Sequence, residues 1–202
     1  MKKVCYIPPM PTKKRIDKVK KVLSYRQPDL RVVLEEVKNT HNASAVTRTC
    51  DAAGILYLDI ISPDMEPFPV NEAISTRAEK WIQINYYKSP SECLSKLKKK
   101  GFQIAATSLE KEALPYYSLN YIKPTAVVFG NEAEGLSKKT EDLSDHKIKI
   151  PMFGMAQSLN LSVSVGVILY EAIKQRKNNN LFGKRGLSPE EFDFYYKKWL
   201  GS

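Results

Sequence analysis

Short apolar runs alternate along the chain with longer segments whose apolar residues recur every three or four positions. The run at 125–129 is continuously apolar, which is typical of a strand buried inside a parallel sheet. The predicted strands are 31–37, 55–60, 81–87, 102–107, 125–129 and 146–152. Because strands alternate with helices through most of the chain, the sequence predicts an α/β domain with a largely parallel sheet.

Capping residues indicate where the first helices begin and end. Thr12 precedes a helix whose apolar residues recur at helical spacing, while lysines and arginines occupy its other faces. Asn42 is a plausible cap for a second helix that ends near Gly54. Ser89 opens a third helix, and Gly101 closes it.

The last two predicted helices differ in their apolar pattern. Residues 158–175 are mostly apolar, so this helix is expected to be buried on more than one side. Ser188 and Glu191 have the spacing of a capping box before a helix with one apolar stripe. The stripe consists of Phe192, Tyr195, Tyr196, Trp199 and Leu200. Either the same chain or a second copy could provide the surface that this stripe needs.

The overall charge narrows the class of partner. With 202 residues and 43% hydrophobic content, the chain can bury one sizeable core. Its 32 Lys and Arg against 22 Asp and Glu leave a net charge of +10, which attracts polyanions. Nucleic acid is therefore the first expected partner, and an anionic membrane surface is the second.

The cysteines and the N-terminus both favour a reducing cytoplasm. The cysteines are Cys5, Cys50 and Cys93. Their odd number and the absence of CxxC spacing argue against a disulfide framework and against a zinc site. Residues 1–14 contain lysines but lack the apolar stretch of a signal peptide.

Membrane insertion and metal binding are also disfavoured. The most apolar long stretch, 155–173, is interrupted by polar residues, which argues against a membrane span. The two histidines, His41 and His146, have no cluster of metal ligands around them. The sequence therefore predicts a soluble protein without a metal site.

Common nucleotide-binding fingerprints are missing. Residues 130–137 have the glycine spacing of a P-loop, but Leu136 stands where the phosphate-binding lysine belongs. No GxGxxG sequence marks an ordinary dinucleotide site, although Gly130 and Gly135 would let the backbone approach a ligand closely. Polar residues gather instead in three stretches beside buried-looking elements, 42–54, 129–137 and 150–164. Their side chains must bond either a ligand or the protein's own backbone.

These stretches resemble the three motifs of the SpoU branch of the SPOUT methyltransferases. The matching runs, in the family's order and spacing, are 42–49, 129–137 and 150–164. The segment 26–30, the basic first helix and the C-terminal helix look like the TrmH group of this family. That group methylates the ribose of guanosine-18 in the D-loop of tRNA. The resemblance covers nearly the whole chain.

The resemblance implies a fold, a cofactor and an assembly. A deep C-terminal trefoil knot would form a bent pocket for S-adenosylmethionine, an exception to the rule that chains do not thread loops. The three parts would be a basic helical extension over 1–30, a knotted methyltransferase domain over 31–176 and a C-terminal helical extension over 177–202. Backbone groups around six residues would bind the cofactor, namely Phe129, Gly130, Ile150, Pro151, Met152 and Leu159. Two copies would form a homodimer in which Arg48 of each helps to complete the site of the other.

The same resemblance implies five catalytic residues, Arg48, Asn42, Glu132, Ser158 and Asn160. Methyl transfer to a ribose hydroxyl requires the 2′-oxygen to be aligned with the methyl group and its proton to be accepted. A guanidinium is a poor base because its pKa lies above ~12, so Arg48 is expected to clamp the RNA phosphate, whose oxygen could accept the proton. A phosphate-assisted arginine base is the alternative.

The other catalytic candidates have supporting roles. Asn42 would fix Arg48 or the substrate, and Asn160 would lock a loop because an amide both donates and accepts. Glu132 would hold Asn42, Arg48 or the charged end of the cofactor. The alternative for Glu132 is a carboxylate at the start of a helix, where the helix dipole favours it.

Basic residues near both ends of the chain are expected to contact tRNA phosphates, and His41 is expected to meet RNA beside Asn42. The basic residues are Lys14, Arg15, Lys18, Arg26, Lys174 and Arg176. A solvated helix face is the alternative for such charge runs. Lys174 and Arg176 depart from the family pattern, in which two arginines often follow the knot helix.

Three other functions are compatible with parts of the sequence. The same chemistry could act on ribosomal RNA, because the motifs encode the reaction and not its target. An RNA-binding protein could keep the knot without catalysis, although the joint presence of all five catalytic candidates argues against it. A membrane-surface protein is disfavoured because the apolar stripe of the first helix is narrow and lacks aromatic residues.

Overall fold

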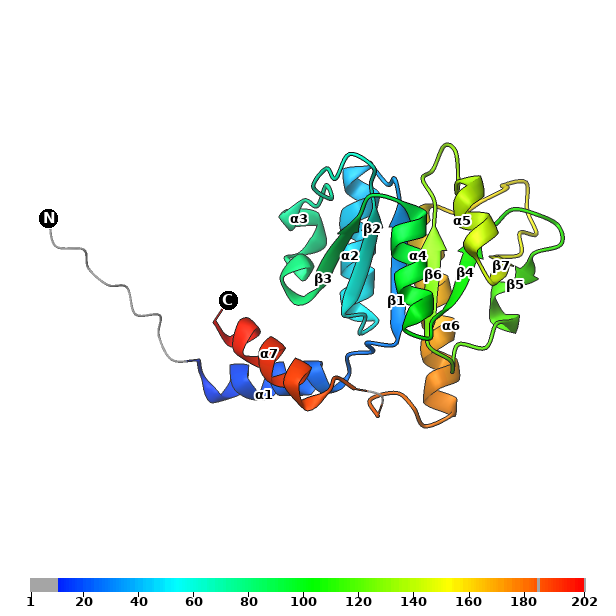
Figure 1. Ribbon diagram of the computed structural model, residues 1–202. Helices are drawn as coiled ribbons and strands as arrows, with labels where there is room; N and C mark the ends of the chain where they lie inside the picture. The colour runs from blue at the N-terminus through cyan, green and yellow to red at the C-terminus, as the bar shows by residue number, and fades with distance from the viewer. Residues whose placement is uncertain (1–10, 185, 202) are drawn as a thin grey trace, which may run out of the picture.

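The centre of the molecule is a seven-stranded parallel sheet (Figure 1). The computed structural model describes residues 11–184 and 186–201. The strands lie in the order β3-β2-β1-β6-β4-β7-β5. They are β1 (Leu30–Glu35), β2 (Tyr57–Ile61), β3 (Gln83–Tyr87), β4 (Gln103–Thr107), β5 (Leu114–Pro115), β6 (Thr125–Phe129) and β7 (His146–Lys149). The predicted α/β class with a parallel sheet is confirmed.

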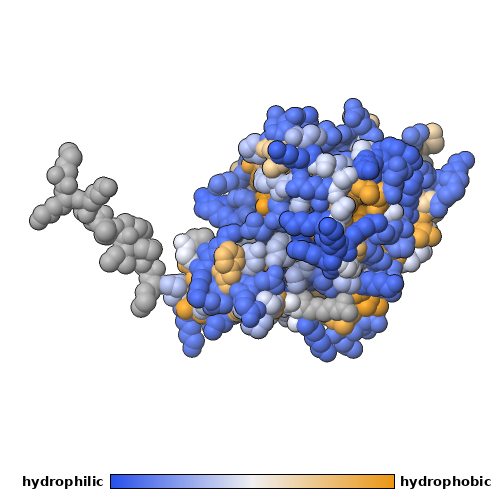
Figure 2. All heavy atoms as spheres, in the orientation of Figure 1, coloured by the Kyte–Doolittle hydropathy of each residue, from blue (hydrophilic) through white to orange (hydrophobic). Residues whose placement is uncertain are grey.

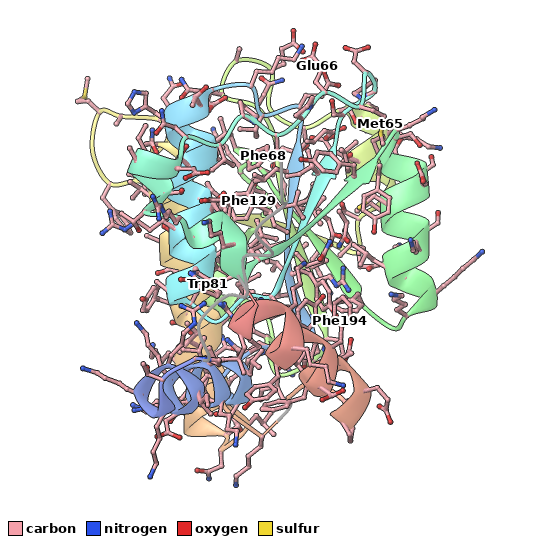
Figure 3. All side chains as sticks on the ribbon, turned by 90° about the vertical axis from the view of Figure 1, so that its left-hand side faces the viewer. Met65, Glu66, Phe68, Trp81, Phe129 and Phe194 are labelled. Carbon is pink, nitrogen blue, oxygen red and sulfur yellow. The ribbon has the colours of Figure 1, made fainter. Side chains whose placement is uncertain are left out.

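Helices cover both faces of the sheet. They are α1 (Lys13–Ser24), α2 (Thr40–Ala52), α3 (Glu72–Ser75), α4 (Pro90–Lys99), α5 (Lys138–Leu143), α6 (Leu161–Asn178) and α7 (Pro189–Leu200), with 3-10 turns η1 (Ala78–Trp81) and η2 (Tyr116–Ser118). Helices α2 and α6 share a core with one face, and α4 and α5 pack against the other. Figure 3 shows Phe129, at the end of β6, in the interior between these layers.

The central strands are buried on both faces, as their continuous apolar runs predict. All described residues of β1 and β6 are buried. Side chains alternate along a strand, so Val32 and Val127 enter the core under α2 and α6, while Val33 and Val128 enter the core under α4. This burial fixes the pairing of β1 with β6, in which Val33 lies beside Val128.

The two terminal helices pack against each other in a small third core. The predicted apolar stripe of α7 contacts α1, with Tyr195 and Trp199 buried beside Val19 and Leu23. The capping box of Ser188 with Glu191 is present. The stripe of α7 is therefore covered within one chain, which makes a second copy unnecessary to explain it. Figure 3 shows Trp81 beside α7, and its ring lies 5.5 Å from that of Trp199.

Two helices begin at other residues than the sequence predicted. Asn39 caps α2 by accepting from the backbone N–H of Asn42 at 3.1 Å, so Asn42 itself lies in the first turn of the helix. Helix α6 begins at Leu161 with Asn160 as its cap, so Ser158 precedes it. In both helices the residue that caps the first turn therefore differs from the one that the sequence pattern indicated.

The remaining expectations concern cysteines, membranes and metals. Cys50 and Cys93 are buried free thiols, and burial raises the pKa of both, while Cys5 lies outside the described residues. Within residues 11–184 and 186–201, no helix has both the length and the apolar character needed to span a bilayer. Over the same residues, no group of His, Cys, Asp or Glu side chains is arranged to hold a metal ion.

Candidate cofactor and RNA site

A cavity of about 810 Å³ lies where β6, β4 and β7 end. In open parallel sheets, ligands bind beyond the carboxyl ends of strands, near the point where the connections change direction. Here the chain runs from β1 to β2 and β3 toward one edge, whereas β4, β6 and β7 lie on the other side of β1. The volume is in the range of small-molecule sites.

Most of the predicted cofactor-binding residues line this cavity. They are Phe129, Gly130, Ile150, Met152 and Leu159, whereas Pro151 is not among the lining residues. Three of the predicted catalytic residues, Glu132, Ser158 and Asn160, also line it. The second and third motifs, which are separate in the sequence, therefore enclose one space.

The loop after β6 is a tight turn in which Gly130 presses against Gly135. A Cβ atom at position 130 would lie 2.1 Å from the carbonyl carbon of Gly135, and Gly135 has a φ of +73°. The backbone N–H of Gly135 donates to the carbonyl of Asn131 at 3.1 Å. Glycine at 130 is thus explained by contact within the loop itself, whereas the sequence argument attributed it to close approach of a ligand.

Asn42 joins the first motif to the other two through its side chain. Its amide donates to the carboxylate of Glu132, and its carbonyl accepts from Nδ2 of Asn160 at 2.9 Å. The Oδ1 atom of Asn160 in turn accepts from the backbone N–H of Ser162 at 2.9 Å and from its hydroxyl at 2.7 Å. Asn42 is 8% exposed, whereas Glu132 and Asn160 are exposed, so the network joins a buried amide to the open edge of the cavity. Three residues from three motifs are therefore held at one edge of the cavity.

Arg48 is not part of that network. It lies six residues beyond Asn42 on α2, which places it about 9 Å further along the helix axis and on another side. Its side chain is exposed, in a stripe of α2 with His41, Ala45 and Ala52. Among the residues that the structure describes, Arg48 has no ion pair, and it does not line the cavity of its own chain. The structure separates Arg48 from the other four predicted catalytic residues.

The charges around the cavity differ from wall to wall. Lys147 donates to Glu110 at 2.6 Å and to Glu141 at 3.4 Å, and its hydrogen bond with Glu110 raises the pKa of the Lys147 ammonium. Within the described part of the chain, neither Glu132 nor Glu134 forms an ion pair with a lysine or arginine. The wall formed by the loop after β6 therefore suits a ligand that carries positive charge.

Sequence reasoning missed one wall of the cavity. It is formed by the last residue of β4, Thr107, and the three residues that follow, Ser108, Leu109 and Glu110. The available signal was that β4 was predicted and that the carboxyl ends of parallel strands meet at one edge. The position of β4 next to β6 was not predicted, because strand order depends on pairings between distant parts of the chain.

The exposed lysines that were predicted to contact tRNA lie at the opposite end of the sheet from the cavity. Lys14 and Lys18 are exposed on α1, at the end of the sheet where β1 begins (Figure 1). Arg15 is partly exposed and donates to the carbonyl of Trp199 at 2.9 Å. Lys174 is exposed on α6 and pairs with Glu171. Hydrophilic residues cover most of the face seen in Figure 2.

Arg26 and Arg176 are buried, which corrects their assignment to RNA phosphates. Arg26 is 1% exposed, pairs with Asp51 and donates to the carbonyl of Ile55 at 2.9 Å. Burial lowers the pKa of this guanidinium, and the attraction of Asp51 opposes that shift. Arg176 is 2% exposed and donates to Asp29 at 2.6 Å. A guanidinium enclosed in this way stabilises the fold and cannot reach a phosphate in solution.

The model of the SpoU rRNA Methylase family matches residues 29–170 of the chain. A protein of Aquifex aeolicus (strain VF5) named tRNA (guanosine(18)-2′-O)-methyltransferase is 45% identical over 186 residues, which cover 92% of this chain and 88% of that protein.

Two solved structures also match. The A. aeolicus TrmH/SpoU tRNA modifying enzyme is 44% identical with a TM-score of 0.88, covering 94% of this chain and 96% of the other. The AdoMet-bound rRNA methyltransferase from Sinorhizobium meliloti is 26% identical with a TM-score of 0.63, covering 79% and 60%. The matches extend through all three motifs and both sides of the cavity, and the chain belongs to the SpoU methylase family.

Proposed function

We propose that this protein transfers a methyl group from S-adenosylmethionine to the 2′-oxygen of a guanosine ribose in tRNA, at guanosine-18 of the D-loop. The observation that carries the proposal is the network of Asn42, Glu132 and Asn160, which joins the three motifs at the edge of one cavity. The choice of tRNA follows the A. aeolicus relative, which is named for methylation of guanosine-18 of tRNA and whose sequence aligns with 92% of this chain.

The cavity fits the proposed cofactor in size and chemistry. Ile150, Leu159 and Leu161 offer apolar surface for the adenine ring, and the backbone beside Gly130 and Met152 offers polar groups. Glu132 and Glu134 suit a positively charged sulfonium and ammonium. When bound, the cofactor supplies an electrophilic methyl group.

The chain's own residues would position the ribose and the RNA phosphate that accepts the hydroxyl proton. Asn160 caps α6, and Asn42 bonds both Asn160 and Glu132. These contacts would keep the edge of the cavity rigid before RNA binds. Ser158 lies beside this edge with its hydroxyl available for the substrate or the cofactor. Arg48 would clamp the adjacent phosphate, whose oxygen takes the hydroxyl proton.

We further propose a homodimer in which Arg48 reaches the cavity of the other subunit. Arg48 lies outside the cavity of its own chain, on an exposed stripe of α2. Phe153 is 98% exposed and Met155 is fully exposed, both on the segment between β7 and α6. Val163 and Tyr170 are exposed on α6, which packs beside α2. Exposed apolar side chains of this size on neighbouring elements are typical of an interface with a second molecule.

A deep trefoil knot over the C-terminal half is part of the same proposal, with the methyltransferase domain spanning 31–176 between the extensions 1–30 and 177–202. The segment before β6 lies across the end of α6, where Gln175 accepts from the backbone N–H of Tyr121 at 3.0 Å and Arg176 donates to its carbonyl at 2.9 Å. These bonds hold the end of α6 against the segment before β6, an arrangement that supports the proposed knot.

Exposed lysines would contact tRNA phosphates at positions distant from the reacting ribose. Lys14 and Lys18 on α1, together with Arg15, and Lys174 on α6 are the candidates that remain, with His41 on the exposed stripe of α2 beside Arg48. Phosphate contacts of this kind add affinity without reading sequence. A cytoplasmic location follows from the proposed tRNA substrate.

The proposed reaction is tested by transfer of a labelled methyl group from S-adenosylmethionine to unmodified tRNA transcripts, followed by mapping of the methylated nucleotide. We expect label at the ribose of guanosine-18 and none when that guanosine is replaced. Label on ribosomal RNA with none on tRNA would keep the chemistry and contradict the substrate. Binding of tRNA and cofactor without methyl transfer to either RNA would contradict the proposed methyltransferase activity.

Replacing Gly130 with alanine tests the cavity loop. The new methyl group would lie 2.1 Å from the carbonyl of Gly135, so the loop must shift. We expect the affinity for S-adenosylhomocysteine to fall about tenfold or more, equivalent to ~1.4 kcal/mol, by calorimetry. Gly154→Ala is the matched control, because nothing lies within 4 Å of a Cβ atom there. Equal affinity of the two variants would show that the loop does not shape the site.

A further inference from the structure

Glu35 is a buried carboxylate that lies outside the cavity. It is the last residue of β1 and is 4% exposed. Its two oxygens accept from a single residue, Ser137, with the hydroxyl at 2.6 Å and the backbone N–H at 3.2 Å. Over the described ranges, Glu35 has no lysine or arginine partner. Burying a carboxylate is costly unless strong hydrogen bonds compensate, so this contact has a fixed geometry.

Ser137 is where the cavity loop ends and α5 begins. Its hydroxyl accepts from the backbone N–H of Thr140 at 3.2 Å and so caps α5. The residues just before it, 131–136, form one wall of the cavity. Any shift of Ser137 relative to the sheet therefore moves that wall.

The loop has internal bonds that set its shape but not its place. Asn131 accepts at its side chain from the backbone N–H groups of Ala133 and Glu134, at 2.9 and 2.7 Å, and Gly130 abuts Gly135. These contacts make residues 130–135 one compact unit. The unit is attached to the sheet at Gly130 through β6, and at its other end through the bonds between Ser137 and Glu35.

We propose that Glu35 is a positioning residue for cofactor binding, which rests on the proposed function. By holding Ser137, it sets the loop so that the cavity keeps its shape and Glu132 meets Asn42. Loss of Glu35 would remove the hydrogen bonds that fix Ser137 to β1 and leave this end of the loop held by the packing of Leu136 and α5 alone. The cofactor would then have to restore the order of the loop when it binds, which weakens its affinity.

Calorimetric binding of S-adenosylhomocysteine to the full chain, without tRNA, tests this role. We expect Glu35→Leu to raise the dissociation constant about tenfold or more, because two hydrogen bonds to a carboxylate are lost. Ser137→Ala should raise it less, because the backbone bond remains. Glu35→Gln should bind within about threefold of the unaltered protein, since its amide can accept from the N–H and donate to the hydroxyl oxygen. Amide hydrogen exchange of residues 131–136 should accelerate in the order of these affinities.

Ser75→Ala is the matched control, since buried Ser75 also donates to a carboxylate, that of Glu79, away from the cavity. It should lower the melting temperature without changing affinity measured well below that temperature. Affinity unchanged in Glu35→Leu, or additive effects of Glu35→Leu and Ser137→Ala, would overturn the positioning role. Ser137→Ala and Glu35→Gln keep the test valid if Glu35→Leu does not fold. Absence of binding by the unaltered protein would contradict the proposed function itself.

Discussion

Arg48→Ala is expected to lower kcat for tRNA methylation by about 10²–10³-fold or more, the loss seen when one transition-state charge partner is removed. The folded state should be almost unaffected, because Arg48 is exposed on α2 and replacing such a residue changes stability by less than about 0.5 kcal/mol. Steady-state kinetics and denaturant unfolding of the purified variant measure the two quantities separately.

The Arg48→Lys variant distinguishes a clamp from a simple positive charge. Lysine keeps the charge but cannot form the planar two-pronged contact with a phosphate. We expect Arg48→Lys to be nearly as inactive as Arg48→Ala at saturating tRNA. Near-normal turnover of the lysine variant would exclude the clamp.

Mixed subunits test whether Arg48 acts across a dimer. Arg48→Ala and Gly130→Val, each inactive alone, would form heterodimers with one intact composite site. Random mixing should restore about a quarter of the normal activity, since half the dimers are mixed and each has one working site. If Arg48 serves its own subunit, both sites of every mixed dimer are defective and the mixture stays inactive.

Arg176→Met is expected to lower the free energy of unfolding by about 3–5 kcal/mol, the cost of removing one member of a buried ion pair. Asp29 would lose its bond to the Arg176 guanidinium, and the carbonyl groups of Tyr121 and Lys123 would lose the hydrogen bonds that Arg176 donates. Because domains of this kind are stable by about 5–15 kcal/mol, the loss is a large fraction of the total. Denaturant unfolding at one fixed protein concentration measures it.

Lys174→Met is the matched control two residues earlier on α6. Lys174 is exposed, and over residues 11–184 and 186–201 its ion-pair partner is Glu171 on its own helix, so its loss should change stability by less than about 0.5 kcal/mol. If Lys174 contacts tRNA, this variant should bind tRNA more weakly. A small stability change in Arg176→Met, together with weaker tRNA binding, would instead indicate that Arg176 contacts RNA.

The fold class was predictable because apolar periodicity reports local structure directly. The run at 125–129 is buried on both faces of the sheet as expected, and Ser188 with Glu191 caps α7 as its spacing indicates. Strand order was not predictable. It depends on pairings such as Val33 with Val128, which no local pattern encodes.

Burial of charged residues was the main failure of sequence reasoning. Arg26 and Arg176 looked like members of a basic surface, because a charge count carries no information on where each side chain lies. Their partners, Asp51 and Asp29, are distant in the sequence, so only the fold brings each pair together.

The role of Asn42 shows how a distant contact decides between local alternatives. Asn39 and Asn42 are both good caps, and nothing within the helix selects one. Asn42 bonds Glu132 and Asn160 instead, which leaves Asn39 at the cap. The local pattern alone predicted Asn42 as the helix cap, and the contacts with Glu132 and Asn160 could not be predicted from it.

The separation of the terminal helices from the cavity has a consequence for how such enzymes diversify. Helices α1 and α7 have their own small core, at the end of the sheet where β1 begins, while the cavity lies where β6, β4 and β7 end. Surface changes on this helix pair leave the loops around the cavity untouched. The RNA contacts proposed for α1 can therefore change in evolution without altering the loops that shape the cavity.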